Sequence, residues 1–92
     1  MVMVNGLPVD YSTLPEHMRE GARLYLEHGI EPGGFLTAVL CNDLVGAYAR
    51  ADHINRERME HWAAWLYHNC PSPAWGSRAK VEAYMTSFAE PE

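Results

Sequence analysis

The sequence predicts a small all-α domain, in which four helices pack as an orthogonal or bundle-like group behind a short N-terminal arm. Two observations predict this class. Apolar residues recur at spacings of three and four along most of the chain, and short stretches rich in Gly and Pro separate these runs. The chain has 92 residues, of which 48% are hydrophobic, enough for one core of modest size. We therefore expect an arm over residues 1–12 and a single helical domain over residues 13–92.

The expected arm precedes any helical spacing. Short apolar residues alternate with others in it, at Val2, Val4, Leu7 and Val9. Such a segment either lies across the helices or pairs with another chain. We favour packing on the helices, because a free disordered arm is usually more polar.

Thr13 and Glu16 have the spacing of a capping box, which predicts that the first helix begins here. Gly29 provides the left-handed residue that commonly follows a helix, and Pro32 prevents continuation. The helix therefore runs to about His28. Its buried stripe is expected to consist of Leu14, Met18, Ala22, Tyr25 and Leu26.

Residues 32–52, PGGFLTAVLCNDLVGAYARAD, predict a second helix from about Gly34 to Arg50. Its apolar residues cover most of the circumference, so we expect neighbouring helices to bury it. Asn42 and Asp43 stand at its centre, and burying them without partners would cost about 1–3 kcal/mol each. Arg50 lies two turns beyond Asp43 and is a candidate partner for that carboxylate.

A third helix is expected from about His53 to Asn69, with Asn55, Met59 and Trp62 on its buried face. Residues 70–76, CPSPAWG, cannot form a regular helix because they contain two prolines and a glycine. Ser77 then caps the last helix. The stripe of that helix comprises Val81, Tyr84, Met85 and Phe88.

The charge composition argues against binding to duplex nucleic acid. Twelve acidic side chains against seven basic ones give a formal charge of −5, which repels a phosphate backbone. Six of the seven cations are arginine, a residue suited to bidentate pairing with carboxylate or phosphate. The composition therefore does not exclude a local binding site for an anion.

The sequence predicts an intracellular protein with neither membrane span nor cofactor. No segment reaches the ~18 apolar residues of a membrane helix, and no basic region precedes a long apolar stretch at the N-terminus. Cys41 and Cys70 form no CxxC pair, which fits a reducing cytosol. The small core and the many aromatic residues favour a homo-oligomer.

Catalytic and metal-binding interpretations find little support in the residue spacing. His61 and His68 share a helical face with Glu57, but no HxxxH, ExxH or CxxC motif is present. Neither cysteine has a recognisable partner for covalent catalysis. Asp43 could act as an acid or base if burial displaced its pKa, although ion pairing with Arg50 is the commoner role for such a residue. We expect no enzyme.

A binding site for a nucleotide is a more specific hypothesis than a catalytic or metal site. Gly33 and Gly34 open the second helix with free backbone N–H groups and no side-chain bulk, which suits a phosphate. Arginines would neutralise the phosphate and aromatic rings would stack on the base. The alternative for each residue is a plain turn or core role. The candidate residues are Gly33, Gly34, Asn42, Asp43, Tyr48, Arg50, Arg56, Trp75 and Arg78.

The stretch PGGFLTAVLCNDLVGAYARAD and the later NCPSPAWGSRAKVEAY resemble a group of short proteins encoded in bacteriophage genomes. The resemblance covers most of residues 14–85, and its most specific parts are Gly-Gly-Phe-Leu, Asn42-Asp43-Leu44, Arg50-Ala51-Asp52 and Trp75-Gly76-Ser77. It implies a phage accessory protein that acts in the cytoplasm of the bacterial host. By analogy with small phage proteins that act as sponges, it implies binding of a nucleotide second messenger of host immunity.

The leading hypothesis is therefore an anti-defence protein that binds and sequesters a cyclic oligonucleotide or a cyclic ADP-ribose. Arg50, Arg56 or Arg78 would neutralise phosphate, and Trp75 or Tyr48 would stack. The alternative is an interaction module that binds a host or phage protein through the exposed aromatic residues of the third and fourth predicted helices, without small ligand or catalysis. An apolar patch without a polar pocket would favour that alternative.

Overall fold

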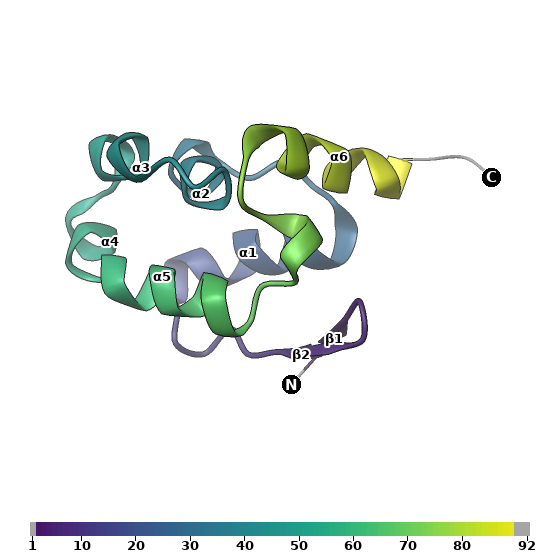
Figure 1. The fold of residues 1–92 in the computed structure, drawn as a ribbon. Helices are drawn as coiled ribbons and strands as arrows, with labels where there is room; N and C mark the ends of the chain where they lie inside the picture. Colours follow the sequence, from purple (N-terminus) through teal and green to yellow (C-terminus); the bar gives the residue numbers. More distant parts are fainter. Residues whose placement is uncertain (1, 90–92) are drawn as a thin grey trace.

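The computed structural model describes residues 2–89, and within this range six α-helices and one 3-10 turn follow a two-stranded hairpin. The mainly helical class is confirmed, whereas the expected count of four helices is wrong. In Figure 1, α2, α3 and α6 lie along one side of the molecule, α4, α5 and the hairpin lie along the other, and α1 runs between them. The elements are β1 (Val2–Val4), β2 (Leu7–Val9), α1 (Glu16–His28), α2 (Gly34–Leu40), α3 (Leu44–Arg50), α4 (His53–Glu57), α5 (Met59–His68), η1 (Ser72–Ala74) and α6 (Arg78–Ala89).

The N-terminal segment is an antiparallel hairpin rather than a simple arm, and it packs on its own chain. Asn5 and Gly6 connect the strands with φ angles of 51° and 77°, as a two-residue hairpin turn requires. The Trp65 indole N–H donates to the Asp10 carbonyl at 3.1 Å, and the Asp10 N–H donates to the side chain of Asn69 at 3.0 Å. These bonds attach the segment after β2 to α5, and Val9 is fully buried.

Helix α1 ends as predicted but begins later. Gly29 is left-handed, and its N–H donates to the Tyr25 carbonyl at 2.9 Å. The predicted capping box is wrong, because the N-cap residue is Pro15 and no side chain caps the helix. Thr13 lies two residues upstream of this N-cap, outside the position from which its hydroxyl could reach the third helical N–H.

The predicted second helix is divided into α2 and α3 by a turn at residues 41–43. Asn42 takes a left-handed conformation, with φ 63°, and interrupts the helical hydrogen bonds. The Asp43 carboxylate then caps α3 by accepting the Gly46 N–H at 2.9 Å. Asn42 and Asp43 are therefore exposed, and the expectation that they are buried inside a helix is wrong.

The predicted third helix is also divided, at Arg58, into α4 and α5. Asn55 of α4 is buried, as expected, and its side-chain oxygen accepts the Trp62 indole N–H at 3.1 Å. At the start of α6 the Ser77 hydroxyl accepts the Lys80 N–H at 3.2 Å, which confirms the predicted cap.

The core lies between the two sides and is rich in aromatic rings. Trp62 packs edge-on against Phe35 and Trp65, with ring centroids 5.4 Å and 6.0 Å away. Tyr25 and Leu26 of α1 are also completely buried, and the ring of Tyr25 packs against that of Tyr84 with centroids 5.2 Å apart. Within the described range 2–89, no helix has both the length and the apolar character needed to cross a bilayer.

Candidate functional site

Four of the predicted binding residues line one polar hollow of about 290 Å³, which we call the Arg50–Arg78 hollow. It lies where the start of α2, the end of α3 and the start of α6 meet. Both arginines line it, but so do two carboxylates, so its formal charge is balanced. The full lining is Glu31, Pro32, Gly34, Thr37, Ala38, Asp43, Arg50 and Arg78.

The Arg50 side chain crosses the start of α2. A Cβ atom on Gly34 would lie 3.3 Å from the Arg50 Cδ, so the glycine makes room for the arginine. The guanidinium donates to the Gly46 carbonyl of its own helix at 3.3 Å. No ion pair joins Asp43 and Arg50 among residues 2–89, so the candidate pairing is not found within this chain. Asp43 instead caps the backbone of α3.

The start of α2 is a weaker anion site than the sequence suggested. Gly33 is its N-cap residue, and no side-chain hydrogen bond is made there. Because α2 has only seven residues, few peptide dipoles align behind its free N–H groups. Gly33 itself is exposed and does not line the hollow.

The remaining candidates are spread over other surfaces. Arg56 lies on α4 and donates to the Ala51 carbonyl at 3.2 Å. Trp75 is half-buried and lines a separate hollow of about 380 Å³ beside Tyr67 and Leu7. Tyr48 is 44% exposed on α3 and lines neither hollow. The structure thus brings Arg50 and Arg78 together, but the aromatic rings that would stack on a base lie on other surfaces.

An apolar groove of about 110 Å³ lies between α3 and α5, and we call it the α3–α5 groove. Trp62 and Leu66 of α5 and Ala47 of α3 are buried along it, while Leu44 at its edge is 65% exposed. Asp43 is the single ionisable residue of the lining in the part of the chain that the structure describes. The full lining is Val39, Asn42, Asp43, Leu44, Ala47, Met59, Trp62, Ala63 and Leu66.

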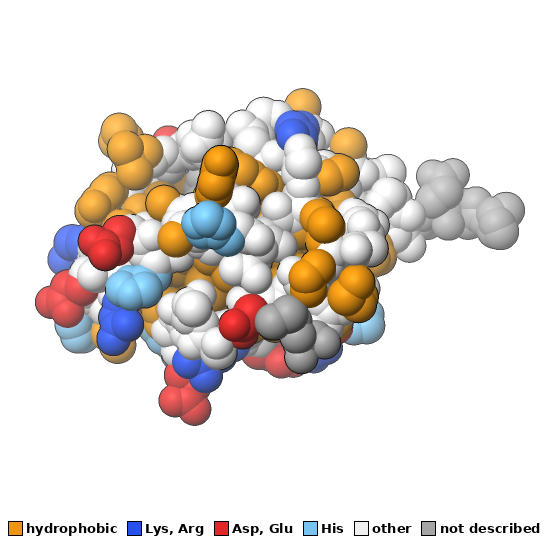
Figure 2. Space-filling view, turned by 60° about the horizontal axis from the view of Figure 1, so that its bottom comes forward, with side chains coloured by type: hydrophobic (Ala, Val, Ile, Leu, Met, Phe, Trp, Pro, Cys, Tyr) orange, Lys and Arg blue, Asp and Glu red, His pale blue; other side chains and the backbone are white. Residues whose placement is uncertain are grey.

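Exposed apolar side chains continue beyond the groove. On α3, Val45 is 79% exposed and Tyr48 44%, and on α5, Tyr67 is 79% exposed. Figure 2 shows hydrophobic side chains at the surface near the α3 end of the molecule and again near the hairpin end. Single exposed apolar residues are common on protein surfaces, whereas large contiguous apolar patches mark interaction sites.

A larger open hollow of about 590 Å³ lies between the start of α1 and α4, and none of the predicted site residues lines it. Arg19 and Arg58 both line it, and the Arg19 guanidinium donates to the carbonyls of Leu14 and Ser12 at 2.9 Å. Its lining holds two arginines and one carboxylate, Glu16, together with the apolar residues Leu14, Pro15 and Ile54.

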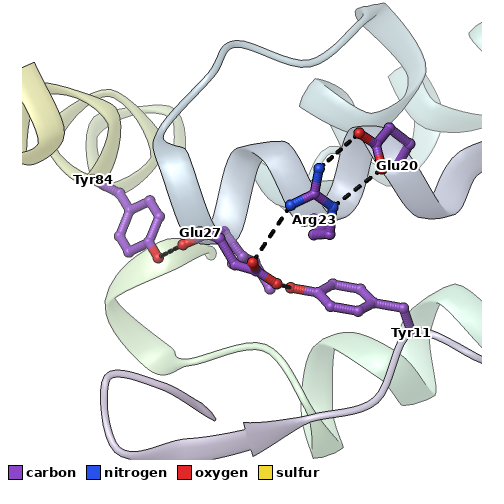
Figure 3. Close-up of polar contacts among 6 residues, drawn as sticks. Tyr11, Glu20, Arg23, Glu27 and Tyr84 are labelled. Carbon is purple, nitrogen blue, oxygen red and sulfur yellow. Dashed lines mark hydrogen bonds and ion pairs between the residues drawn. The ribbon is translucent and has the colours of Figure 1, made fainter. Parts of the chain in front are cut away.

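The most extended polar network is structural. In Figure 3 the Tyr11 hydroxyl donates to Glu27 at 3.0 Å, and Arg23 lies between Glu27 and Glu20. Burial and the hydrogen bond to Glu27 raise the pKa of Tyr11 above its ordinary range. Figure 3 also shows Tyr84 of α6 reaching α1, where its hydroxyl donates to the Leu26 carbonyl. These contacts hold the N-terminal segment and α6 against α1.

The two cysteines are in environments that favour the thiol. Burial raises the pKa of the Cys70 thiol to about 12, and burial also raises that of Cys41. A nucleophilic cysteine needs the opposite shift. Among residues 2–89, no three His, Cys, Asp or Glu side chains gather as a possible metal site.

Comparison with protein-family models, with curated proteins and with solved structures finds no significant match to this chain. The resemblance to phage proteins therefore stays a prediction.

The α3–α5 groove is not predicted by the sequence. The apolar pattern of residues 34–50 predicts one buried helix, which places the apolar residues after Asp43 in the core. The signal for the groove was present in Asn42-Asp43, because Asn favours left-handed backbone and Asp favours the N-cap position. A helix break there predicts that Leu44 and Val45 start a new helix with its own orientation.

Proposed function

We propose that this chain is a non-catalytic interaction domain that binds another protein through the α3–α5 groove. The observation that carries the proposal is the groove itself, with buried apolar walls and the exposed side chain of Leu44 in its lining. Val45 and Tyr48 are exposed on the same helix. Interfaces of this kind place a few large side chains into an apolar pocket surrounded by polar residues.

The test compares proteins captured by three tagged versions of the chain from a lysate of the cells that carry its gene. The double variant Leu44→Lys/Val45→Lys places two charges on α3, one of them in the lining of the groove. Ile54→Lys is the control, because Ile54 is an exposed apolar residue of α4 that lies outside the groove. Circular dichroism first establishes that all three versions keep the same helical content.

We expect a protein that the unmodified chain and Ile54→Lys capture and that the double variant loses. Capture of the same proteins by all three versions, or of none above bare resin, contradicts the proposal.

We propose as a second candidate that the Arg50–Arg78 hollow binds a phosphorylated small molecule. The ligand implied by the phage resemblance is a cyclic oligonucleotide or cyclic ADP-ribose, sequestered in the host cytoplasm. The observation that favours it is the presence of Gly34, Arg50 and Arg78 around one hollow. The two carboxylates could accept hydrogen bonds from ribose hydroxyls.

The test is native mass spectrometry and calorimetry with a panel of cyclic dinucleotides, cyclic trinucleotides and cyclic ADP-ribose isomers. Arg50→Ala should weaken binding about tenfold or more, since a hydrogen bond to a charged group contributes about 1.5–3 kcal/mol. Arg56→Ala serves as the control, because Arg56 lies on another surface. Equal affinity of the two variants, or no adduct with the unmodified chain, contradicts this candidate.

A further inference from the structure

We infer that the partner element in the α3–α5 groove is a basic amphipathic helix of another protein, with one large apolar side chain inserted into the groove. This inference rests on the proposed function and names the chemistry of its partner. It follows from the volume of the groove, the dimensions of the face around it and the charges at its edge.

The volume fits one side chain. A cavity of ~150 Å³ holds a benzene ring, so the 110 Å³ of the groove suits a single leucine or methionine side chain. Ala63 of α5 lines the groove and is exposed. This small residue allows the backbone of a docked helix to come close.

The dimensions of the face fit one helix better than a second copy of the chain. With ten residues α5 is about 15 Å long, and two adjacent helices are about 20 Å wide, so the face covers about 300 Å². A stable dimer buries about 800 Å² on each partner. A docked helix of ten to twelve residues, about 15–18 Å long, matches the length of α5.

The charges at the edge of the groove select a basic partner. Asp43 lines one end, and Glu60 is exposed one turn before Ala63 on the same face of α5. None of the lining residues within 2–89 is Lys or Arg, although Asp43 also lines the Arg50–Arg78 hollow together with those two arginines. A second copy carries the same formal charge of −5 and would be repelled, whereas Lys or Arg beside the apolar anchor would be attracted.

The experiment is a selection of helical peptides about 14 residues long, displayed as a randomised library, on the immobilised full chain. Enriched peptides are then measured on Ala63→Glu and on Ala64→Glu. Both variants add the same carboxylate to α5, but only residue 63 lines the groove. Attraction by charge alone is therefore equal on the two variants, while insertion into the groove is blocked in Ala63→Glu.

We expect enriched peptides to carry one large apolar residue with Lys or Arg within one turn of it. They should bind Ala64→Glu as they bind the unmodified chain, and lose about tenfold or more in affinity on Ala63→Glu. Enrichment of acidic or extended peptides, equal binding to both variants, absence of enrichment, or a dimer that Ala63→Glu dissociates would each overturn the inference. A cellular partner that depends on Leu44 and Val45 but binds through another kind of segment would overturn this inference alone and leave the proposed function in place.

Discussion

At residue 42 the backbone is left-handed, and at residue 43 a carboxylate caps the next helix. Asn tolerates positive φ because its short polar side chain can bond locally, and Asp is among the best N-cap residues. The two side chains therefore act on the backbone around them. The sequence showed that they need polar partners, but the partner of Asp43 is the Gly46 N–H and not Arg50.

This role predicts different outcomes for two substitutions of Asp43. Asp43→Ala removes the cap and should lower the free energy of unfolding by about 1 kcal/mol. Asp43→Asn keeps a capping oxygen and should stay close to the unmodified chain. Urea unfolding followed by circular dichroism measures both. If Asn destabilised the chain as much as Ala, the carboxylate charge would be needed, and an ion pair with Arg50 would explain that result better.

At the scale of elements, the sequence predicted where helices begin and end more accurately than whether they are continuous. Gly29 and Ser77 mark a helix end and a helix start that the structure confirms. Both predicted long helices are broken, at residues 41–43 and at Arg58, because local caps and turns there override the periodic apolar pattern. The hairpin was missed although Asn5-Gly6 is a typical turn pair.

The break after α2 has a consequence for function. An unbroken helix could have kept the apolar residues of 44–49 in the core. Because α3 is short and takes a direction of its own, only Ala47 is buried in it, and Leu44, Val45 and Tyr48 face outward. The candidate interaction surface exists for this reason.

At the scale of the whole molecule, three tyrosine hydroxyls connect distant parts of the chain. Tyr11 donates to Glu27, Tyr25 donates to the Ala74 carbonyl at 2.7 Å, and Tyr84 donates to the Leu26 carbonyl. The three bonds join α1 to the region that precedes it, to η1 and to α6, respectively. Burial raises the pKa of Tyr84 to about 12 and raises those of Tyr11 and Tyr25 further.

These shifts predict a loss of stability in alkali. A tyrosine whose pKa is higher in the folded chain keeps its proton at a pH where the unfolded chain releases it. The stabilisation is fully present below the ordinary pKa of 10.0 and decreases as pH rises from 10 toward 12. We expect the urea midpoint to be lower at pH 11 than at pH 8, and to fall less in Tyr84→Phe. Equal midpoints at both pH values would contradict this prediction.

The sequence by itself determined the helical class, the end of α1, the cap of α6 and the acidic charge, because each depends on local spacing or on composition. Only the tertiary structure decided which apolar residues enter the core. Ala47 is buried while Val45, two residues earlier, is 79% exposed, and this difference depends on the direction α3 takes after a single left-handed residue. The same applies to the predicted binding residues. Gly34, Arg50 and Arg78 converge because α2, α3 and α6 meet, whereas Arg56 and Trp75 lie on other surfaces, and sequence spacing carries no information about distances between separate helices.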